Sequence, residues 1–457
     1  MSDATVVVPA APRPCRHRVW LFRFLFAYAL IWTFPTPLAA IPSTLKWLAE
    51  RDCLAKSKPA LDHVLVPLLE KSKVVADAWE RWSDVAVRWS DAHVLHAGVT
   101  VGPLGSGDTT WNYVQLLLWV VAALVVSLLW LAVDWRRTHH ARLGALLRIW
   151  LRYVVGTALV SYGAAKVIPS QMPTPNLAEL VGRFGDASPM GVLWRMIGLS
   201  SGYSVFGGLA ELVPGVLLFF RRTATLGALL GAATLANVVA LNFCYDVPVK
   251  LYSSHLFLMA LVVAAPDLRK LFDLFVRHTP SPPLAGGPLF SRRWANLTFA
   301  PLHLLLVGGF CSAEFAGDWQ ARMKWGDGAP RSPWRGVWNV AEFEQDGLPR
   351  PPLLTDAERW RAVIFDSAAI VAIERMDASQ QWFELAHEPE SHTLKLSTLR
   401  EPKQVFSLAY SDPQEGAMTL EGVVDGHRLR AKLELDAKGF LALDRGFHWV
   451  NETPLNR

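Results

Sequence analysis

The residues whose type and spacing could do chemistry are ionisable side chains inside long apolar segments. Glu211 lies within the apolar stretch Phe206–Gly215, where an ionised group at the centre of a membrane helix costs about 3 kcal/mol. Gly207, Glu211 and Gly215 recur every four residues, so they share a helix face of small residues that suits close helix packing. The pattern predicts that Glu211 points into a helix bundle. There it would handle a proton, contact a polar head group, or make a structural hydrogen bond.

A second polar group lies near the ends of two neighbouring apolar segments. It comprises Asn242, Cys244, Tyr245, Asp246, Lys250, Ser254 and His255. This set suits a small ligand-binding pocket in which the carbonyl oxygen of a quinone would find hydrogen-bond donors. Solvation of helix ends is the alternative, and it is favoured for Asp246 and Lys250. Lys166, at the end of another segment, is expected to snorkel to the membrane interface or to pair with Glu211.

Several familiar chemistries have no motif in this chain. No Cys-x-x-Cys, His-Glu-x-x-His, Walker or Gly-x-Ser-x-Gly pattern occurs, so nucleotide binding, common hydrolytic mechanisms and a metal site have no support. His255 and His303 stand in separate segments without a haem-binding motif. We expect both to be hydrogen-bonded packing residues.

The elements that position these residues belong to a mostly apolar chain. Its 457 residues are 52% hydrophobic and 19% charged, whereas about 25% of residues are charged in an ordinary soluble protein. Crossing a hydrocarbon core of about 30 Å takes about 20 helical residues. Seven segments are that long or nearly so: 19–41, 112–133, 149–168, 203–220, 224–245, 249–266 and 295–313.

The basic residues predict how these segments are oriented. Residues 1–313 contain 28 Lys and Arg against 17 Asp and Glu, whereas residues 314–457 contain 17 against 23. The basic clusters precede the first segment and separate the second from the third, the fourth from the fifth and the sixth from the seventh. All of them fall on one side if every segment spans, so the positive-inside rule predicts a cytoplasmic N-terminus and an external C-terminal domain. Basic runs between apolar stretches indicate a lipid bilayer as the partner, and no nucleic acid.

Expected boundaries follow from this orientation. The first segment has a poor cleavage site and is interpreted as an uncleaved span. Cys15 is then cytoplasmic, while Cys53, Cys244 and Cys311 lie at or beyond the outer boundary, where one disulfide is an open option. The divisions are a tail at 1–18, a span at 19–41, an outer helical segment at 42–111, a span with a basic loop at 112–148, a four-helix core at 149–268, a linker at 269–294, a last span at 295–313 and an outer domain at 314–457.

The outer segment contains a heptad-like repeat. Leu68, Val75, Trp82 and Trp89 recur every seven residues, and Leu65, Trp79 and Ala86 lie on the neighbouring line. The pattern predicts an amphipathic helix with a seam like that of a coiled coil. Such a helix would lie on the membrane surface, because tryptophan favours the interface. Binding of a partner helix is the alternative. A second amphipathic stretch is expected over 176–199.

The C-terminal domain has the pattern of β-strands. Short alternating runs separated by turn signals predict an antiparallel up-and-down β-barrel, with a sandwich as the alternative. An eight-stranded barrel has room for one small lipophilic ligand, unless Phe365, Trp382, Phe383, Phe406 and Phe440 fill it. The runs are 337–344, 360–366, 369–375, 381–387, 393–399, 404–410, 417–423, 427–435 and 439–445.

Gly336-Val337-Trp338 opens the first of these runs, and Arg445 closes the last. This arrangement resembles the lipocalin (calycin) family. The resemblance implies that Trp338 packs across the base of the barrel beneath Arg445, with Gly336 beside it.

The middle of the chain carries a second resemblance. It rests on Gly163-Ala164-Ala165-Lys166, on the run from Gly207 to Leu218, and on Arg221-Arg222-Thr223-Ala224-Thr225-Leu226-Gly227. With these motifs, residues 149–266 resemble the DoxX-like family of four-span bacterial membrane proteins. The resemblance implies an inner-membrane protein with a periplasmic outer domain, and Lys166 and Glu211 as its polar core. The three further spans and the β-domain depart from that family.

We therefore expect a quinone- or redox-linked component of an envelope complex. The cofactor is left open, with quinone as one option. A redox protein and a lipophilic ligand are optional partners beside the bilayer, and no residue is assigned as catalytic. The alternative is a non-enzymatic envelope protein whose β-barrel binds a lipid or another lipophilic ligand.

Overall fold

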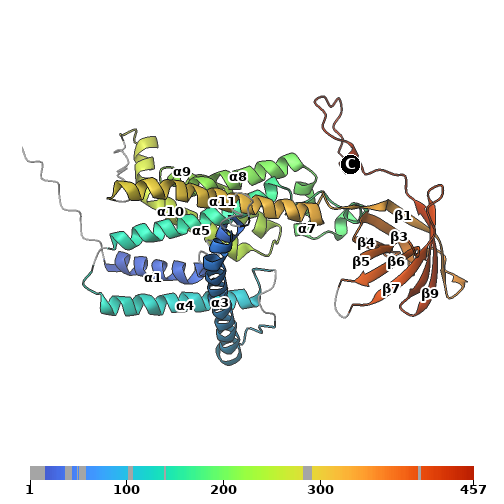
Figure 1. Ribbon diagram of the computed structural model, residues 1–457, viewed down its shortest axis with the longest axis horizontal. Helices are drawn as coiled ribbons and strands as arrows, with labels where there is room; N and C mark the ends of the chain where they lie inside the picture. The colour runs from blue at the N-terminus through green and yellow to red at the C-terminus, as the bar shows by residue number, and fades with distance from the viewer. Residues whose placement is uncertain are drawn as a thin grey trace, which may run out of the picture. The chain divides into compact units, whose positions relative to one another are not determined.

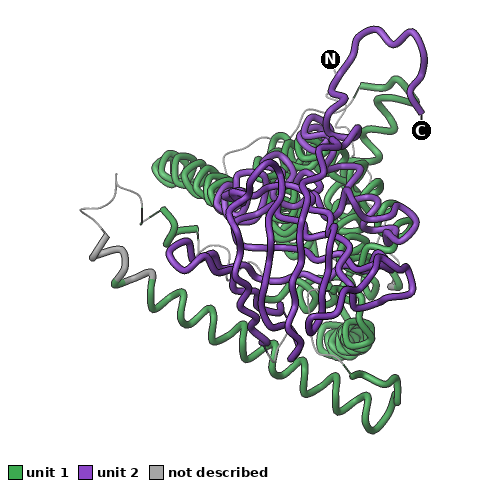
Figure 2. The backbone as a smooth tube through the Cα atoms, turned by 90° about the vertical axis from the view of Figure 1, so that its right-hand side faces the viewer, with its two compact units in different colours: residues 1–165, 207–316 green, residues 166–206, 317–457 purple. Residues whose placement is uncertain are grey.

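The computed structural model describes residues 16–35, 44–48, 50, 58–100, 106–137, 140–280, 291–399 and 403–456. The chain forms two compact units, coloured separately in Figure 2: unit 1 contains residues 1–165 and 207–316, and unit 2 contains 166–206 and 317–457. Several predictions concern residues outside the described ones. They are most of the N-terminal tail, the end of the first span, Cys15, Cys53 and residues 281–290 of the 269–294 linker.

Unit 1 is helical (Figure 1). Among the described residues, six helices are long and apolar enough to cross a membrane, and a shorter apolar stretch lies over Val19–Thr33. These helices indicate a membrane protein, as the composition predicts. The first predicted span, 19–41, is described only as far as Pro35. The helices are α1 (Arg16–Thr33), α3 (Lys58–Ser90), α4 (Thr110–Val133), α5 (Ala141–Val167), α8 (Ser201–Phe219), α9 (Ala224–Cys244), α10 (Lys250–Phe275) and α11 (Arg293–Trp325).

Hydrogen bonds of arginine side chains show which helix ends lie together. Arg23 of α1 is fully buried, and its Nη2 donates to the Asp134 carbonyl just after α4, at 2.6 Å. Arg148 of α5 donates to the Asp267 carboxylate of α10 at 2.5 Å, and Thr225 of α9 donates to the same oxygen at 2.6 Å. Arg23 Nε also lies 3.1 Å from His140 Nε2, just before α5. The end of α4 and the starts of α1, α5 and α9 therefore lie together with the C-terminal part of α10. The predicted basic loops follow or precede these ends.

The opposite helix ends meet through an aspartate. Asp108, just before α4, accepts from the backbone N–H of Lys250 at 2.7 Å and of Leu251 at 2.9 Å. These are free N–H groups of the first turn of α10, and a carboxylate satisfies them well. Val249, the residue at the start of α10, makes no side-chain cap of its own, so a distant segment supplies the cap.

Small residues let α5 and α8 approach closely. A Cβ added to Gly163 would lie 2.6 Å from the Leu212 nitrogen, and one added to Gly215 would lie 3.0 Å from Val160. Close contact through glycine is typical of helix packing in lipid. The predicted small-residue face is confirmed for Gly215 but is wrong for Gly207, which has open space around it. Gly208, the next residue, is the buried one. An α-helix has 3.6 residues per turn, so residues spaced four apart do not stay on one face.

The predicted amphipathic helix is α3, which crosses the directions of α1 and α4 in Figure 1. Its packed face differs from the heptad line. Val87 and Ser83 are buried, and Trp79 stacks on Trp119 of α4 with the ring centroids 5.1 Å apart. Leu68, Val75, Trp82 and Trp89 are instead 42–58% exposed.

Unit 2 contains a closed antiparallel barrel, which confirms the predicted architecture. Eight strands pair in chain order, β1 also pairs with β9, and the two-residue β2 adds to the edge of β1. Eight of the nine predicted runs form strands. The strands are β1 (Arg331–Gln345), β2 (Leu348–Pro349), β3 (Trp360–Ser367), β4 (Ile370–Arg375), β5 (Gln380–Glu388), β6 (Thr393–Thr398), β7 (Val405–Tyr410), β8 (Ala417–Val424) and β9 (His427–Leu435).

The ninth predicted strand, 439–445, is wrong. Residues Leu441–Asp444 form the short helix α12, and Arg445 caps its end and donates to Asn451. Arg445 is therefore not a strand residue above Trp338. Closure of the sheet by β1 and β9 leaves no open edge for another strand.

The barrel interior is packed with apolar side chains. One continuous cluster includes Trp334, Trp338, Phe365 and Phe383, all less than 9% exposed, with Phe406 packed against it. Phe365, Phe383 and Phe406 thus pack inside the barrel, in agreement with the alternative of a filled interior. Trp382 belongs instead to a cluster on the outer face, as does Phe440. Trp382 precedes Phe383, and neighbouring strand residues point to opposite faces.

A buried arginine lies in the barrel, but it is Arg359, which sequence reasoning missed. Its guanidinium donates to the carbonyls of Arg350, Trp360 and Val340 at 2.8, 2.9 and 3.2 Å. It is 2% exposed. Burial lowers the pKa of Arg359, an effect that the charge of Asp356 opposes.

The predicted amphipathic stretch 176–199 is broken into short pieces in unit 2. They are α6 (Leu177–Val181), a single 3₁₀ turn and α7 (Pro189–Gly198). Leu177 and Ala178 of α6 pack on the outer face of the barrel against Ile364 and Ala372.

Candidate functional site

His255 has the most defined surroundings of the predicted site residues. Its Nδ1 lies 2.6 Å from the Leu251 carbonyl, and its Nε2 lies 2.5 Å from the Tyr28 hydroxyl. A carbonyl only accepts, so Nδ1 carries the proton of the neutral ring and Tyr28 donates to Nε2. The imidazole also stacks on Trp32, with centroids 4.5 Å apart and planes 7° apart.

Further rings extend this group across unit 1. Trp32 stacks on Tyr252 at 5.8 Å, and Tyr252 lies 6.3 Å from Tyr162. We call Tyr28, Trp32, Tyr162, Tyr252 and His255 the aromatic cluster. Of these five residues only His255 was predicted as a site residue. The other four are aromatic side chains of a kind that is common in apolar membrane-spanning segments.

Glu211 is buried, as predicted, at 4% exposed. A Cβ on Gly163 would lie 2.6 Å from the nitrogen of Leu212, so Glu211 and Tyr162, the residues that precede Leu212 and Gly163, lie beside the same α5–α8 contact at the far end of the aromatic cluster. Lys166 belongs to unit 2, where its carbonyl accepts a hydrogen bond of 2.9 Å from the Ser204 hydroxyl.

The polar group at 242–255 divides into structural and solvent-facing parts. Asn242 is buried and donates to the Ser253 hydroxyl at 3.0 Å, which joins α9 to α10. Asp246 is exposed and accepts from the Lys250 ammonium at 2.7 Å, in agreement with the helix-end interpretation. The predicted pocket therefore does not include Asp246.

The remaining members of that group contribute little polar chemistry. Tyr245 and Ser254 are half-buried, and Cys244 is an exposed free thiol. Cys311 is also free. Neither thiol therefore forms a disulfide within the described part of the chain.

A second tyrosine–histidine pair occurs in unit 1. Tyr153 of α5 lies with its hydroxyl 2.8 Å from His303 Nε2 of α11, and Phe299 stacks on the imidazole at 5.6 Å. His303 thus packs by hydrogen bonding, as predicted. Within the described ranges, no three His, Cys, Asp or Glu side chains are grouped in a way that could hold a metal ion.

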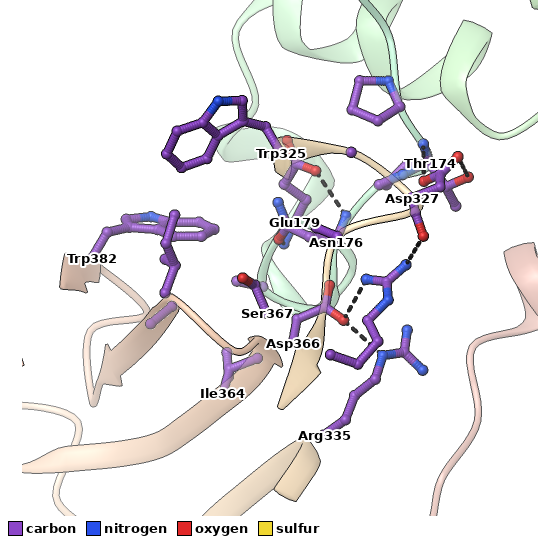
Figure 3. Close-up of a pocket in the computed structure, with 18 of the residues that line it drawn as sticks. Thr174, Asn176, Glu179, Trp325, Asp327, Arg335, Ile364, Asp366, Ser367 and Trp382 are labelled. Atoms are coloured by element: carbon purple, nitrogen blue, oxygen red, sulfur yellow. Dashed lines mark hydrogen bonds and ion pairs between the residues drawn. The ribbon is translucent and has the colours of Figure 1, made fainter. Parts of the chain in front are cut away.

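Unit 2 has a pocket of about 220 Å³ that sequence reasoning did not find. Figure 3 shows it between the loop before α6, the end of α11 and the outer face of the barrel. Asp366 is at its centre: its Oδ1 accepts from Arg335 at 2.7 Å and Arg331 at 3.1 Å. Its Oδ2 accepts from the backbone N–H of Leu177 at 3.2 Å.

The pocket has one polar wall and one apolar wall. In Figure 3, Thr174, Asp327 and Arg335 lie on one side, while Trp325 and Trp382 lie on the other. Arg331 and Ile364 also line the pocket. Its residues come from four parts of the chain that are far apart in the sequence: 173–179, 324–335, 364–382 and Leu443. No local motif could have brought them together, although Arg331 and Arg335 lie four apart in one strand.

Part of the chain is similar to a known bacterial protein. No family model matches it, and no solved structure is significantly similar. The chain is 32% identical over 123 residues to the uncharacterized protein YwoB of Bacillus subtilis (strain 168). The match covers 72% of that protein and 25% of this chain. Since the matched region takes in most of the relative at this identity, the chain belongs to the same family as YwoB.

Proposed function

We propose that unit 1 binds the head group of a quinone-type membrane lipid. The observation that carries this proposal is the Tyr28–His255 hydrogen bond against the face of Trp32. A quinone head group is a flat ring with carbonyl oxygens, so it needs an aromatic surface and a hydrogen-bond donor. Tyr28 donates to His255 in this structure, and its hydroxyl is the group that would turn to a ligand carbonyl.

The biological setting follows from the resemblance of residues 149–266 to the DoxX-like family. On that basis the chain is a redox-linked component of an envelope complex in a bacterial inner membrane. A partner protein would exchange electrons with the bound quinone, because the sequence contains no flavin, haem or iron–sulfur motif. The packed barrel interior gives the alternative, a ligand inside the barrel, less support.

The proposal is tested by the lipids that copurify with the protein. The full chain is purified in mild detergent, and quinones in the extract are measured by mass spectrometry. Tyr28→Phe removes one donor and should lower the quinone content about tenfold, the effect of losing about 1.4 kcal/mol of binding energy. Glu211→Gln should lower it less, since Glu211 lies at the edge of the aromatic cluster.

The second tyrosine–histidine pair supplies the matched control. Tyr153→Phe breaks a similar hydrogen bond to His303 and should leave the quinone content unchanged. If the wild-type protein carries no quinone, or if the two tyrosine variants lose it equally, the proposal is wrong.

A further inference from the structure

The pocket in unit 2 offers hydrogen-bond donors more than acceptors. Asp366 already accepts three hydrogen bonds, and both carboxylate oxygens of Asp327 accept from Thr174, at 3.1 and 3.2 Å. Glu179 accepts from the backbone N–H of Asn176 at 3.0 Å in a capping box. The three carboxylates of the lining are thus engaged in holding the loop and the barrel together.

The basic side chains that line the pocket have further N–H groups to offer to a ligand. A guanidinium has five N–H groups. Among contacts between described residues, Arg335 donates through Nε alone and Arg331 through Nη1 and Nη2. The side chains of Arg331 and Arg335 are 42% and 45% exposed. Lys324 also lines the pocket, with its ammonium 4.8 Å from the centre of the Trp325 ring.

The remaining lining suits an apolar group. Its apolar residues are Trp325, Trp382, Ile364 and Ile370, and the two tryptophans lie opposite Arg335 in Figure 3. The volume of about 220 Å³ equals that of roughly seven liquid waters. It therefore accommodates a head group and the first carbons of a chain, but not a whole lipid.

The pocket adjoins the end of an apolar helix. Lys324 and Trp325 are the last residues of α11, which is apolar enough to cross a membrane. A helix of 33 residues extends about 50 Å, longer than a hydrocarbon core of about 30 Å. Trp319 and Trp325 near its end are 50% and 66% exposed, and tryptophan at a helix end is typical of the membrane–water interface.

We infer that this pocket binds the anionic head group of an amphiphile, a phosphate or carboxylate, between Arg331, Arg335 and Lys324. The apolar part of the ligand then lies against Trp325 and Trp382. Paired arginines are suited to such groups, because a guanidinium presents two parallel N–H donors to two oxygens. This site is separate from the quinone proposal and does not depend on it.

Photo-crosslinking in nanodiscs tests the inference on the full chain. The probe is a phosphatidylglycerol with a diazirine at the start of its acyl chain, in a phosphatidylcholine bilayer, and labelled peptides are mapped by mass spectrometry. Peptides that contain residues 324–335 and 364–382 should be labelled. Arg335→Ala should reduce this labelling about tenfold, the effect expected for loss of a charge-assisted hydrogen bond.

Two further variants separate binding from folding. Lys324→Gln leaves the ion pairs of Asp366 in place and should still reduce labelling several-fold. Arg430→Ala removes an exposed arginine of β9 that pairs with Glu421, outside the pocket lining, and should leave labelling unchanged.

The outcomes also identify the source of the head group. Labelling that millimolar inorganic phosphate does not displace indicates a lipid ligand, whereas displacement indicates that a soluble phosphate occupies the same donors. Equal labelling by a phosphatidylcholine probe, or equal labelling of the Arg335→Ala and Arg430→Ala variants, would overturn the inference.

Discussion

Arg359 is held by main-chain carbonyls inside the barrel. Replacing it with methionine leaves three carbonyl oxygens without this donor, two of them in buried contacts, and each unsatisfied buried polar group costs about 1–3 kcal/mol. We expect Arg359→Met to destabilise the barrel by about 3 kcal/mol or more. Hydrogen–deuterium exchange of β1 and β3 peptides in the full chain measures this loss.

Lys432 of β9 provides the control. Its side chain is 47% exposed, and its ammonium lies 3.1 Å from the carboxylate of Glu342 in β1, which is 68% exposed. Lys432→Met should change exchange in the same peptides by less than about 1 kcal/mol, because exposed ion pairs contribute little. Equal effects of the two substitutions would contradict the structural role of Arg359.

Single residues were predictable where the argument concerned burial. Glu211 and Trp338 are both buried as expected, since a charge in an apolar helix and a tryptophan in a strand each have few other stable positions. The position of Arg445 could not be predicted from the resemblance to the lipocalin family. It depends on whether the chain forms another strand after Leu435. The burial of Arg359 could not be predicted, because no motif in the neighbouring sequence indicates it. Its hydrogen-bond partners are main-chain carbonyls, which every residue has.

At the scale of elements, α3 presents an apolar face that no helix of the described chain covers fully. Val74, Val85 and Trp89 are 58–66% exposed, and Trp82 stacks on Trp119 of the apolar helix α4 at 5.7 Å. Trp119 lies nine residues inside α4, about 13 Å from its start. The face of α3 thus continues the lipid-facing surface of α4, and we expect it to lie in the membrane interface.

Spin labels on α3 test this expectation. In a variant with its native cysteines replaced by serine, labels at Val74→Cys and Val85→Cys should be accessible to oxygen dissolved in the bilayer. A label at Asp77→Cys, on the polar side of the same helix, should instead be accessible to a water-soluble nickel complex. Equal access of nickel to all three labels would show that the apolar face meets water.

The elements themselves were largely predictable from the sequence. The strands followed from alternation and turn signals, because β-structure is determined by a period of two residues. The packed face of α3 was not predictable. The helix has more than one row of apolar side chains, and the row that packs is the one whose shape fits α4. The pocket was not predictable either, because it forms only when α6, α11 and β3 are brought together.

At the scale of the whole molecule, the contacts between helix ends help to predict how the helices of unit 1 are oriented in a membrane. Arg148 and Asp267 join the start of α5 to the end of α10, and Arg152 donates to the Leu218 carbonyl at the end of α8, at 2.9 Å. The basic residues 136–148, 221–222 and 269–277 therefore adjoin helix ends on one side of unit 1. Such one-sided enrichment predicts that this side is cytoplasmic.

Reporter fusions test this orientation on the whole chain. Alkaline phosphatase, which folds only outside the cytoplasm, should be active when fused after Arg457 and inactive when fused after Arg222. A fluorescent protein that fails to fold in the periplasm should give the reverse result at the same two sites. Changing Arg221 and Arg222 to glutamine serves as a control, because the other basic clusters should keep the orientation. Active phosphatase after Arg222 would place the basic ends outside, and the positive-inside argument would then fail for this bundle.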